Sequence, residues 1–166
     1  MGMSGTSQVD DEALALLEHL LASSQALQLA TLGEGPEASY APFVFTEGAL
    51  YIYISELAGH TENLMRSSAV GAMLIEDEAA SRNQFARNRI MLQCSAAEVG
   101  ADTEEYDAVL ALYREKHGPT VDLLRSLPDF ILFRLTPREG RLVIGFGRAF
   151  TLQLPGFQLQ PITAKS

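Results

Sequence analysis

The sequence predicts a mainly β fold with a few peripheral helices (α+β), most simply a small antiparallel barrel. Seven strand-like segments are spread over about 130 of the 166 residues, short turns join most of them, and helical patterns are few. So many strands in a small domain would leave unpaired edges, so we expect the sheet to close on itself and the chain to form a homodimer.

Composition narrows the class of protein. Hydrophobic residues make up 47% of the chain and charged residues 20%, as in an ordinary globular domain. The net charge of −9 argues against nucleic acid as a partner, because that partner needs a basic face. No apolar run approaches the roughly 20 residues of a membrane span. We therefore expect no membrane partner, and any anion that the chain binds must be held by a local pocket.

The first residues, MGMSGTSQVDDE, show neither a basic region nor an apolar run, so we expect no secretory signal. The lone cysteine, Cys94, cannot form an internal disulfide and suits a reducing, cytoplasmic location. We expect residues 1–9 to be a flexible leader, residues 10–152 a single domain, and residues 153–166 an extended tail.

The first elements follow from periodicity. An amphipathic helix is expected over residues 10–22, with Asp10 as its N-cap and leucines along one face. Alternating apolar and polar residues then predict three strands, with a tight turn at Glu47-Gly48 between the last two. Their expected ranges are 25–32, 38–46 and 49–55.

Later elements alternate between strand and helix. A short helix is expected at 60–66, a fourth strand at 69–76 and a fifth at 89–99, with a loop at 77–88 that contains a helical turn near 81–86. Glu105 follows Asp102 at capping spacing, which favours a helix to about His117 and a further turn or two over 121–127. Two last strands are expected at 130–137 and 141–152, around a turn at 138–140, and Gly145-Phe146-Gly147 is interpreted as a bulge or a packing point within the final strand.

Three arginines fall within eight positions of the 77–88 loop and the strand after it: Arg82, Arg87 and Arg89. Guanidinium groups are planar, forked donors that suit carboxylates and phosphates, so this cluster indicates a site for an anionic small molecule. The alternative is a solvated loop whose arginines pair with the neighbouring acids Glu76, Asp77 and Glu78. Spacing alone leaves both interpretations open.

Common catalytic and metal motifs are absent. The chain contains no P-loop and no Gly-x-Ser-x-Gly elbow, and its three histidines are isolated rather than paired at metal-ligand spacing. The functional class that remains is a protein that binds a cofactor in a pocket, with or without redox chemistry supplied by that cofactor.

Four segments in order, SYAPFV, YIYISELAGHTENL, MLIEDEAASRNQFARNRI and GRLVIGFGRAF, resemble the HugZ/HutZ haem-utilisation family. That family lies within the pyridoxamine-phosphate-oxidase-like superfamily of FMN-binding split barrels. The resemblance covers residues 10–152. It implies an antiparallel split β-barrel that dimerises, with haem bound in a cleft at the dimer interface and degraded oxidatively to release iron.

The resemblance also implies site residues. It places His60 and Arg89 in the haem cleft, and it makes Asp129 the hydrogen-bond support of the proximal histidine. That histidine comes from the C-terminal segment in haem-degrading members, whereas residues 118–166 here contain none. The other residues expected to contact a cofactor are Ser55, Thr61, Asn63, Arg82 and Arg87.

Two alternatives to haem degradation stay open. One is an FMN-dependent oxidoreductase, although flavin-binding split barrels usually carry an Arg-Lys pair where this chain has Gly59-His60. The His60 backbone amide, Ser55 and Thr61 could still supply donors for a phosphate. The other is a carrier that holds haem or flavin without catalysis.

Overall fold

The computed structural model describes residues 4–163, and for residues 4–10 it describes the backbone only. The helices are α1 (Ser4–Ser23), α2 (Gly59–Arg66), the short 3-10 turn η1 (Gln84–Ala86), α3 (Glu104–His117) and α4 (Thr120–Arg125). The strands are β1 (Ala26–Leu32), β2 (Pro36–Thr46), β3 (Ala49–Ser55), β4 (Ala69–Ile75), β5 (Arg89–Val99), β6 (Phe130–Ile144), β7 (Arg148–Gln153) and β8 (Gln158–Pro161).

Six of the strands close into an antiparallel barrel in the order β3-β2-β1-β4-β5-β6. The barrel closes because β3 pairs with the first part of β6, from Leu50 opposite Leu135 to Ser55 opposite Phe130. The long β6 continues past this seam and carries β7 and β8 as an outer hairpin. The prediction of a closed antiparallel barrel is therefore confirmed.

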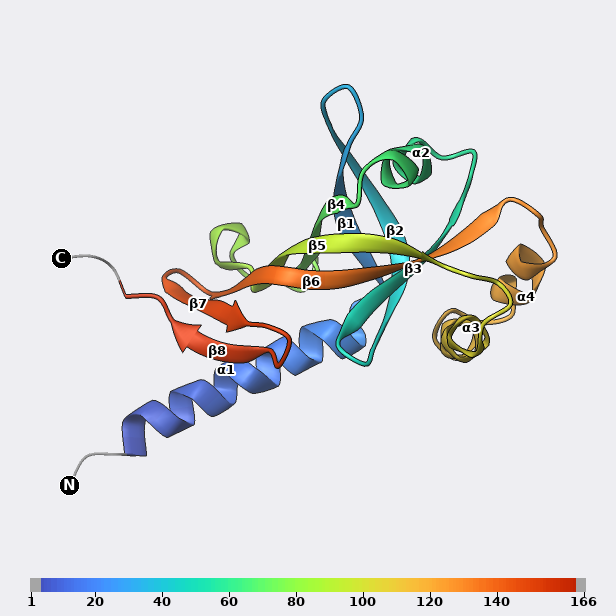
Figure 1. Ribbon diagram of the computed structural model, residues 1–166. Helices are drawn as coiled ribbons and strands as arrows, with labels where there is room; N and C mark the ends of the chain where they lie inside the picture. Colours follow the sequence, from blue (N-terminus) through green and yellow to red (C-terminus); the bar gives the residue numbers. More distant parts are fainter. Residues whose placement is uncertain (1–3, 164–166) are drawn as a thin grey trace.

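The main core fills the barrel. Alternate side chains of each strand point inward, as Leu27 and Leu29 do from β1 and Ile90 and Leu92 from β5, and all are buried. Helix α1 and the β7–β8 hairpin cover one side of this core, where Leu17 packs into it (Figure 1). None of the helices within the described residues is long and apolar enough to span a bilayer.

A second, smaller core lies outside the barrel wall. There Tyr51 and Tyr53 of β3 pack with Leu132 of β6 against Leu110 and Tyr113 of α3. Helices α3 and α4 thus cover the outer face of the seam between β3 and β6, at the end of the molecule opposite β7 and β8 (Figure 1).

One hydroxyl bridges the point where β2 changes partner. Residues up to Pro42 pair with β1, and those from Phe43 pair with β3. The Tyr113 hydroxyl accepts a hydrogen bond from Tyr53 N at 3.0 Å. Its own proton can be donated to either of two carbonyl oxygens, Pro42 O at 2.7 Å and Tyr51 O at 3.0 Å. Pro42 has no N–H to offer a ladder, so it is tolerated at this bend.

The start of the first helix differs from the prediction. Helix α1 begins at Ser4, so Asp10 lies inside the helix and is not its N-cap. Residues 4–9, expected in a flexible leader, are part of this helix, and residues 1–3 lie outside the described part of the chain.

The turn expected at 138–140 is wrong. Strand β6 runs through it without a break, and a β-bulge opposite Gln93 and Cys94 absorbs the irregular residues. Gly140 is needed for packing, since a Cβ there would lie 2.8 Å from both Leu152 and Leu92. The actual turn is at Gly145-Phe146-Gly147, where Gly145 has a φ of 56° that favours glycine.

The tail is more ordered than expected. Residues 158–161 form β8, which pairs with β7, and Phe157 and Leu159 pack against the main core. These two apolar side chains alternate with polar residues, which is the pattern of an edge strand with one face on the core.

We expect Tyr113→Phe to destabilise the protein by about 1–3 kcal/mol, because it leaves the buried Tyr53 N–H without its acceptor. Urea unfolding of the variant measures this free energy. Tyr40→Phe is the control, since the Tyr40 side chain is 69% exposed and should change stability by less than about 0.5 kcal/mol. Equal stability of the two variants would contradict the bridging role of Tyr113.

Cys94 should be inert in the native protein. It is 6% exposed, and burial raises the pKa of its thiol to about 12, so almost no thiolate exists at pH 8. Ellman's reagent should therefore label Cys94 only after denaturant unfolds the chain. Rapid stoichiometric labelling in buffer would show that this core position opens.

Candidate functional site

The expected site residues fall into two groups. We call the first the α2 half-site; it consists of Ser55, His60, Thr61, Asn63 and Asp129. We call the second the arginine face. It comprises the arginines of the 77–88 loop and of the outward-facing side of β5 and β6: Arg82, Arg87, Arg89, Arg138 and Arg141.

The α2 half-site is built where the barrel closes. Ser55 pairs with Phe130, so its side chain lies close to Asp129, the residue before Phe130. The Ser55 hydroxyl donates to Asp129 Oδ2 at 2.7 Å. The backbone repeats the link, since Glu56 N donates to Asp129 O at 2.7 Å. Thr61, on the first turn of α2, donates to Ser55 O at 2.5 Å. The end of β3, the start of α2 and the start of β6 are therefore tied together.

A second set of polar contacts fixes α2 on the barrel. Asn63 Nδ2 donates to Thr31 Oγ1 (3.0 Å) and to Glu37 Oε2 (2.7 Å), which lie on β1 and β2. Thr61 and Asn63 are 1% and 5% exposed, so their polar groups are occupied within the protein. Both residues hold α2 in place, and the cofactor contact expected of them stays a prediction.

His60 is the member of this group with chemistry to offer. Its Nδ1 lies 2.9 Å from Ser39 Oγ of β2. Partial burial lowers the pKa of the imidazole below its ordinary value and so favours the neutral ring. Ser39 therefore fixes one edge of a neutral imidazole, and sequence reasoning missed it because a lone serine in a strand carries no signal.

The arginine face is distinguished by the absence of ion pairs. The chain has ten arginines, and five of them pair with a carboxylate: Arg66, Arg114, Arg125, Arg134 and Arg148. Among the residues that the structure describes, no ion pair involves the other five. Those five make up the arginine face, so the predicted alternative of a loop neutralised by its own acids is wrong.

The loop arginines do different things. Arg87 Nε donates to Glu76 O at 2.9 Å, which turns this guanidinium toward a cavity of about 620 Å³ between α1, β1 and the loop. Arg89 stays on the outer side of β5, where one guanidinium nitrogen donates to Arg87 O at 2.9 Å. Arg82 lies on the exposed part of the loop. The predicted cluster is thus divided between two sides of the sheet.

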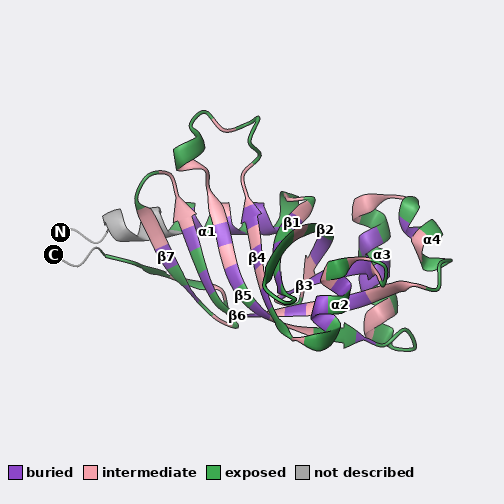
Figure 2. Cartoon of the chain, turned by 90° about the horizontal axis from the view of Figure 1, so that it is seen from above, coloured by how far each residue is buried: buried purple, intermediate pink, exposed green. Residues whose placement is uncertain are grey.

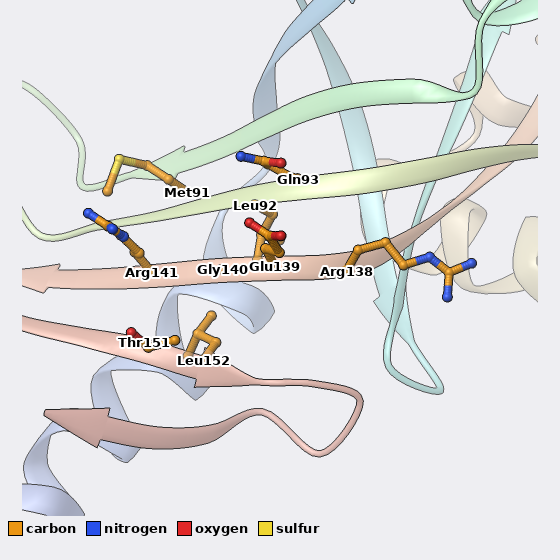
Figure 3. Close-up of a pocket in the computed structure, with 9 residues that line it drawn as sticks. All are labelled: Met91, Leu92, Gln93, Arg138, Glu139, Gly140, Arg141, Thr151 and Leu152. Atoms are coloured by element: carbon orange, nitrogen blue, oxygen red, sulfur yellow. The ribbon is translucent and has the colours of Figure 1, made fainter. Parts of the chain in front are cut away.

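Arg138 and Arg141 extend the arginine face along β6. They line a groove of about 470 Å³ with Met91, Gln93 and Thr151, and Arg141 extends from β6 toward Met91, its cross-strand partner (Figure 3). Sequence reasoning missed both arginines because it expected a turn at 138–140. That turn would have placed Arg138 in a loop and Arg141 on a separate strand.

The groove belongs to a larger surface that we call the open face, the outward side of β1 and β4 and of the paired segments 89–95 of β5 and 138–144 of β6. Leu32, Met73 and Met91 lie there, and within the described residues no helix covers it. The burial pattern in Figure 2 alternates along these strands, with only every second residue buried.

Arg89 of the arginine face lies at a different level of the barrel from the α2 half-site. Asn63 binds Thr31, whose neighbour Ala30 pairs with Gly71, whereas Arg89 pairs with Ile75. Four residues of β4 separate these levels, or about 13 Å at the usual rise of a strand. One chain therefore presents an imidazole and a carboxylate at one level and the guanidinium group of Arg89 at another, while Arg138, opposite Gln93 and Cys94, is level with Gly71.

Comparison with known proteins agrees with this fold. A family model described as pyridoxamine 5'-phosphate oxidase matches residues 10–144. A curated protein of Vibrio cholerae named "Heme oxygenase HutZ" is 41% identical over 128 residues, which are 76% of this chain and 73% of that protein.

Solved structures agree as well. A crystal structure of HutZ from Vibrio cholerae, described as the heme storage protein, superimposes with a TM-score of 0.73 at 37% identity, covering 78% of this chain and 92% of that one. ChuZ of Campylobacter jejuni gives a TM-score of 0.81 at 29% identity, covering 94% of this chain and 63% of that one. The resemblance drawn from the sequence is confirmed: this chain belongs to the pyridoxamine 5'-phosphate oxidase family of split barrels.

Proposed function

We propose that this protein binds haem for haem utilisation, in a cleft that two copies of the chain complete. The observation that carries the proposal is the arginine face, whose guanidinium groups form no ion pair with any described residue although the chain has a net charge of −9. Charges left without partners on an acidic protein favour an anionic ligand, and haem carries two propionates.

The relatives support haem as that anion. HutZ is named a heme oxygenase in one description and a heme storage protein in another, and a further solved relative at 26% identity is a heme-binding protein from Mycobacterium smegmatis. Of the described residues, His60 is the imidazole that the α2 half-site offers to a haem, and its lowered pKa favours the neutral form that an iron ligand needs. When bound, haem would supply the oxidative chemistry, and the chain would hold its propionates and enclose its ring.

The dimer is proposed because the open face needs a cover. Leu32 is 49% exposed there, and Met73 and Met91 are only partly buried. Burying such a surface against a second copy would remove apolar area from water. We propose that the α2 half-site of one chain then meets the arginine face of the other, so that each cleft takes residues from both chains.

FMN is the second candidate. The family model carries the name of an FMN-type oxidase, and a phosphate could also use the arginine face. The position where flavin-binding members carry an Arg-Lys pair is Gly59-His60 here, and the lowered pKa of His60 keeps that side chain uncharged at pH 7. A phosphate dianion gains little from a neutral ring, so haem is preferred.

Purified protein should bind hemin and not retain FMN. Titration with hemin should give a shifted, saturating Soret band at one haem per chain, and gel filtration should remove added FMN. A retained flavin spectrum with no saturable Soret change would replace haem by FMN as the ligand. Ascorbate is then added to the hemin complex to decide whether this protein degrades haem or stores it. Loss of the Soret band shows oxidative degradation, and its persistence shows storage.

We expect Arg89→Ala to weaken hemin binding by about tenfold or more, because a charge-assisted contact to a carboxylate is lost. Arg114→Ala is the matched control, since it removes the same charge from an exposed ion pair with Asp122 on the helical side of the molecule. Unchanged affinity in the Arg89 variant would exclude this arginine from the site.

Met73→Asp should convert the dimer to a monomer. Met73 points outward from the middle of the open face, opposite Gln28 and Met91, so a carboxylate there would be desolvated in each copy of the interface. Light scattering after size exclusion measures the mass of the particle, and circular dichroism checks the fold. A dimer that survives this change would place the interface elsewhere.

A further inference from the structure

We propose that Arg141 supplies a second guanidinium to the cleft and, together with Arg89, binds the two propionates of one haem. This inference rests on the proposed haem binding and deepens it, because it assigns the anionic edge of the ligand to a particular pair of side chains on neighbouring strands.

The strand register brings the two arginines together. On β5 and β6, Arg89 pairs with Val143, and Met91 pairs with Arg141. An offset of two residues keeps Arg89 and Arg141 on the same side of the sheet as diagonal neighbours, with Cα atoms about 7–8 Å apart. The register therefore puts both on the open face with Met91 beside them. Figure 3 shows the Arg141 side chain extending from β6 toward Met91.

The two arginines differ in how firmly they are held. Arg89 is half-buried, and one nitrogen of its guanidinium group donates to Arg87 O at 2.9 Å. This hydrogen bond fixes the orientation of the guanidinium plane and leaves its other N–H groups for a ligand. Arg141 is exposed, and no hydrogen bond to another described residue holds it. One arm of the pair is thus positioned by the protein and the other is free to follow the ligand.

No carboxylate of the described residues neutralises this pair. The nearest acid along β6 is Glu139, which pairs with Gln93 in the ladder and forms no ion pair with Arg141. Glu76, at the end of β4, accepts a hydrogen bond from Asn88 N at 3.0 Å instead. Two like charges on diagonal positions repel each other, and that repulsion is removed when an anion lies between them.

The spacing suits a ligand with two carboxylates on one edge. Each guanidinium can hold one carboxylate through two parallel hydrogen bonds, and two such contacts from neighbouring strands match two propionates better than a single phosphate. The groove next to Arg141, of about 470 Å³, also offers the side chains of Met91 and Thr151 to an apolar ring. We conclude that the pair selects for a planar dicarboxylate.

The test compares hemin with hemin dimethyl ester, whose propionates carry no charge. We expect the wild-type chain to bind hemin about ten- to a hundredfold more tightly than the ester. Arg141→Ala should weaken hemin binding by about tenfold and leave binding of the ester within about twofold. Arg141→Lys should recover part of the loss, because it restores the charge without the fork. Arg114→Ala again controls for net charge, and thermal melts check that each variant is folded.

Three results would overturn the inference, and they are distinguishable. If the wild-type chain binds hemin but Arg141→Ala binds it equally well, Arg141 is outside the site while the proposed function stands. If Arg141→Ala weakens hemin and the ester to the same extent, the arginine supports the fold or the ring and not the propionates. If the wild-type chain binds neither compound, the proposed function fails together with this inference.

Discussion

The pairing of β3 with β6 is the constraint on which the rest of the structure depends. It closes six strands into a barrel, so that the inward side chains form one core and the outer side of the seam can be covered by α3. The same pairing places the end of β3 beside the start of β6, which brings Ser55 within 2.7 Å of Asp129. The α2 half-site is therefore a direct consequence of barrel closure.

Closure also decides where the remaining surface is exposed. Helices α3 and α4 cover the seam, and α1 covers the barrel with the outer hairpin, while among the described residues no helix covers the open face. Arginines with ion-pair partners lie mostly on the helices, whereas those without partners lie on this uncovered side and its loop. A molecule of net charge −9 thus keeps a local positive surface where a second chain and an anionic ring can meet.

Much of the fold could be predicted from the sequence because the strands alternate clearly. The barrel, the short helix at His60 and the helical turn in the arginine loop all follow from local pattern. The continuous strand β6 could not be predicted, because Pro137 and Gly140 are usual signs of a turn. In the structure a bulge opposite β5 accommodates this segment, and Gly140 packs closely against Leu152. That error concealed Arg141 as a candidate site residue. In the α2 half-site the polar residue types were identified, but which of them are buried supports depends on long-range contacts such as Asn63 with Thr31.

The claim that each cleft is shared by two chains is tested most directly by mixing two defective proteins. One chain would carry Arg89→Ala with Arg141→Ala, and the other would carry His60→Ala, so that neither homodimer has a complete cleft. A mixed dimer holds one cleft with all three native side chains and one with none of them. The account predicts that unfolding and refolding the two together restores tight hemin binding to about half of the clefts in mixed dimers. Mixtures that bind no better than the separate proteins would show that the site lies within a single chain.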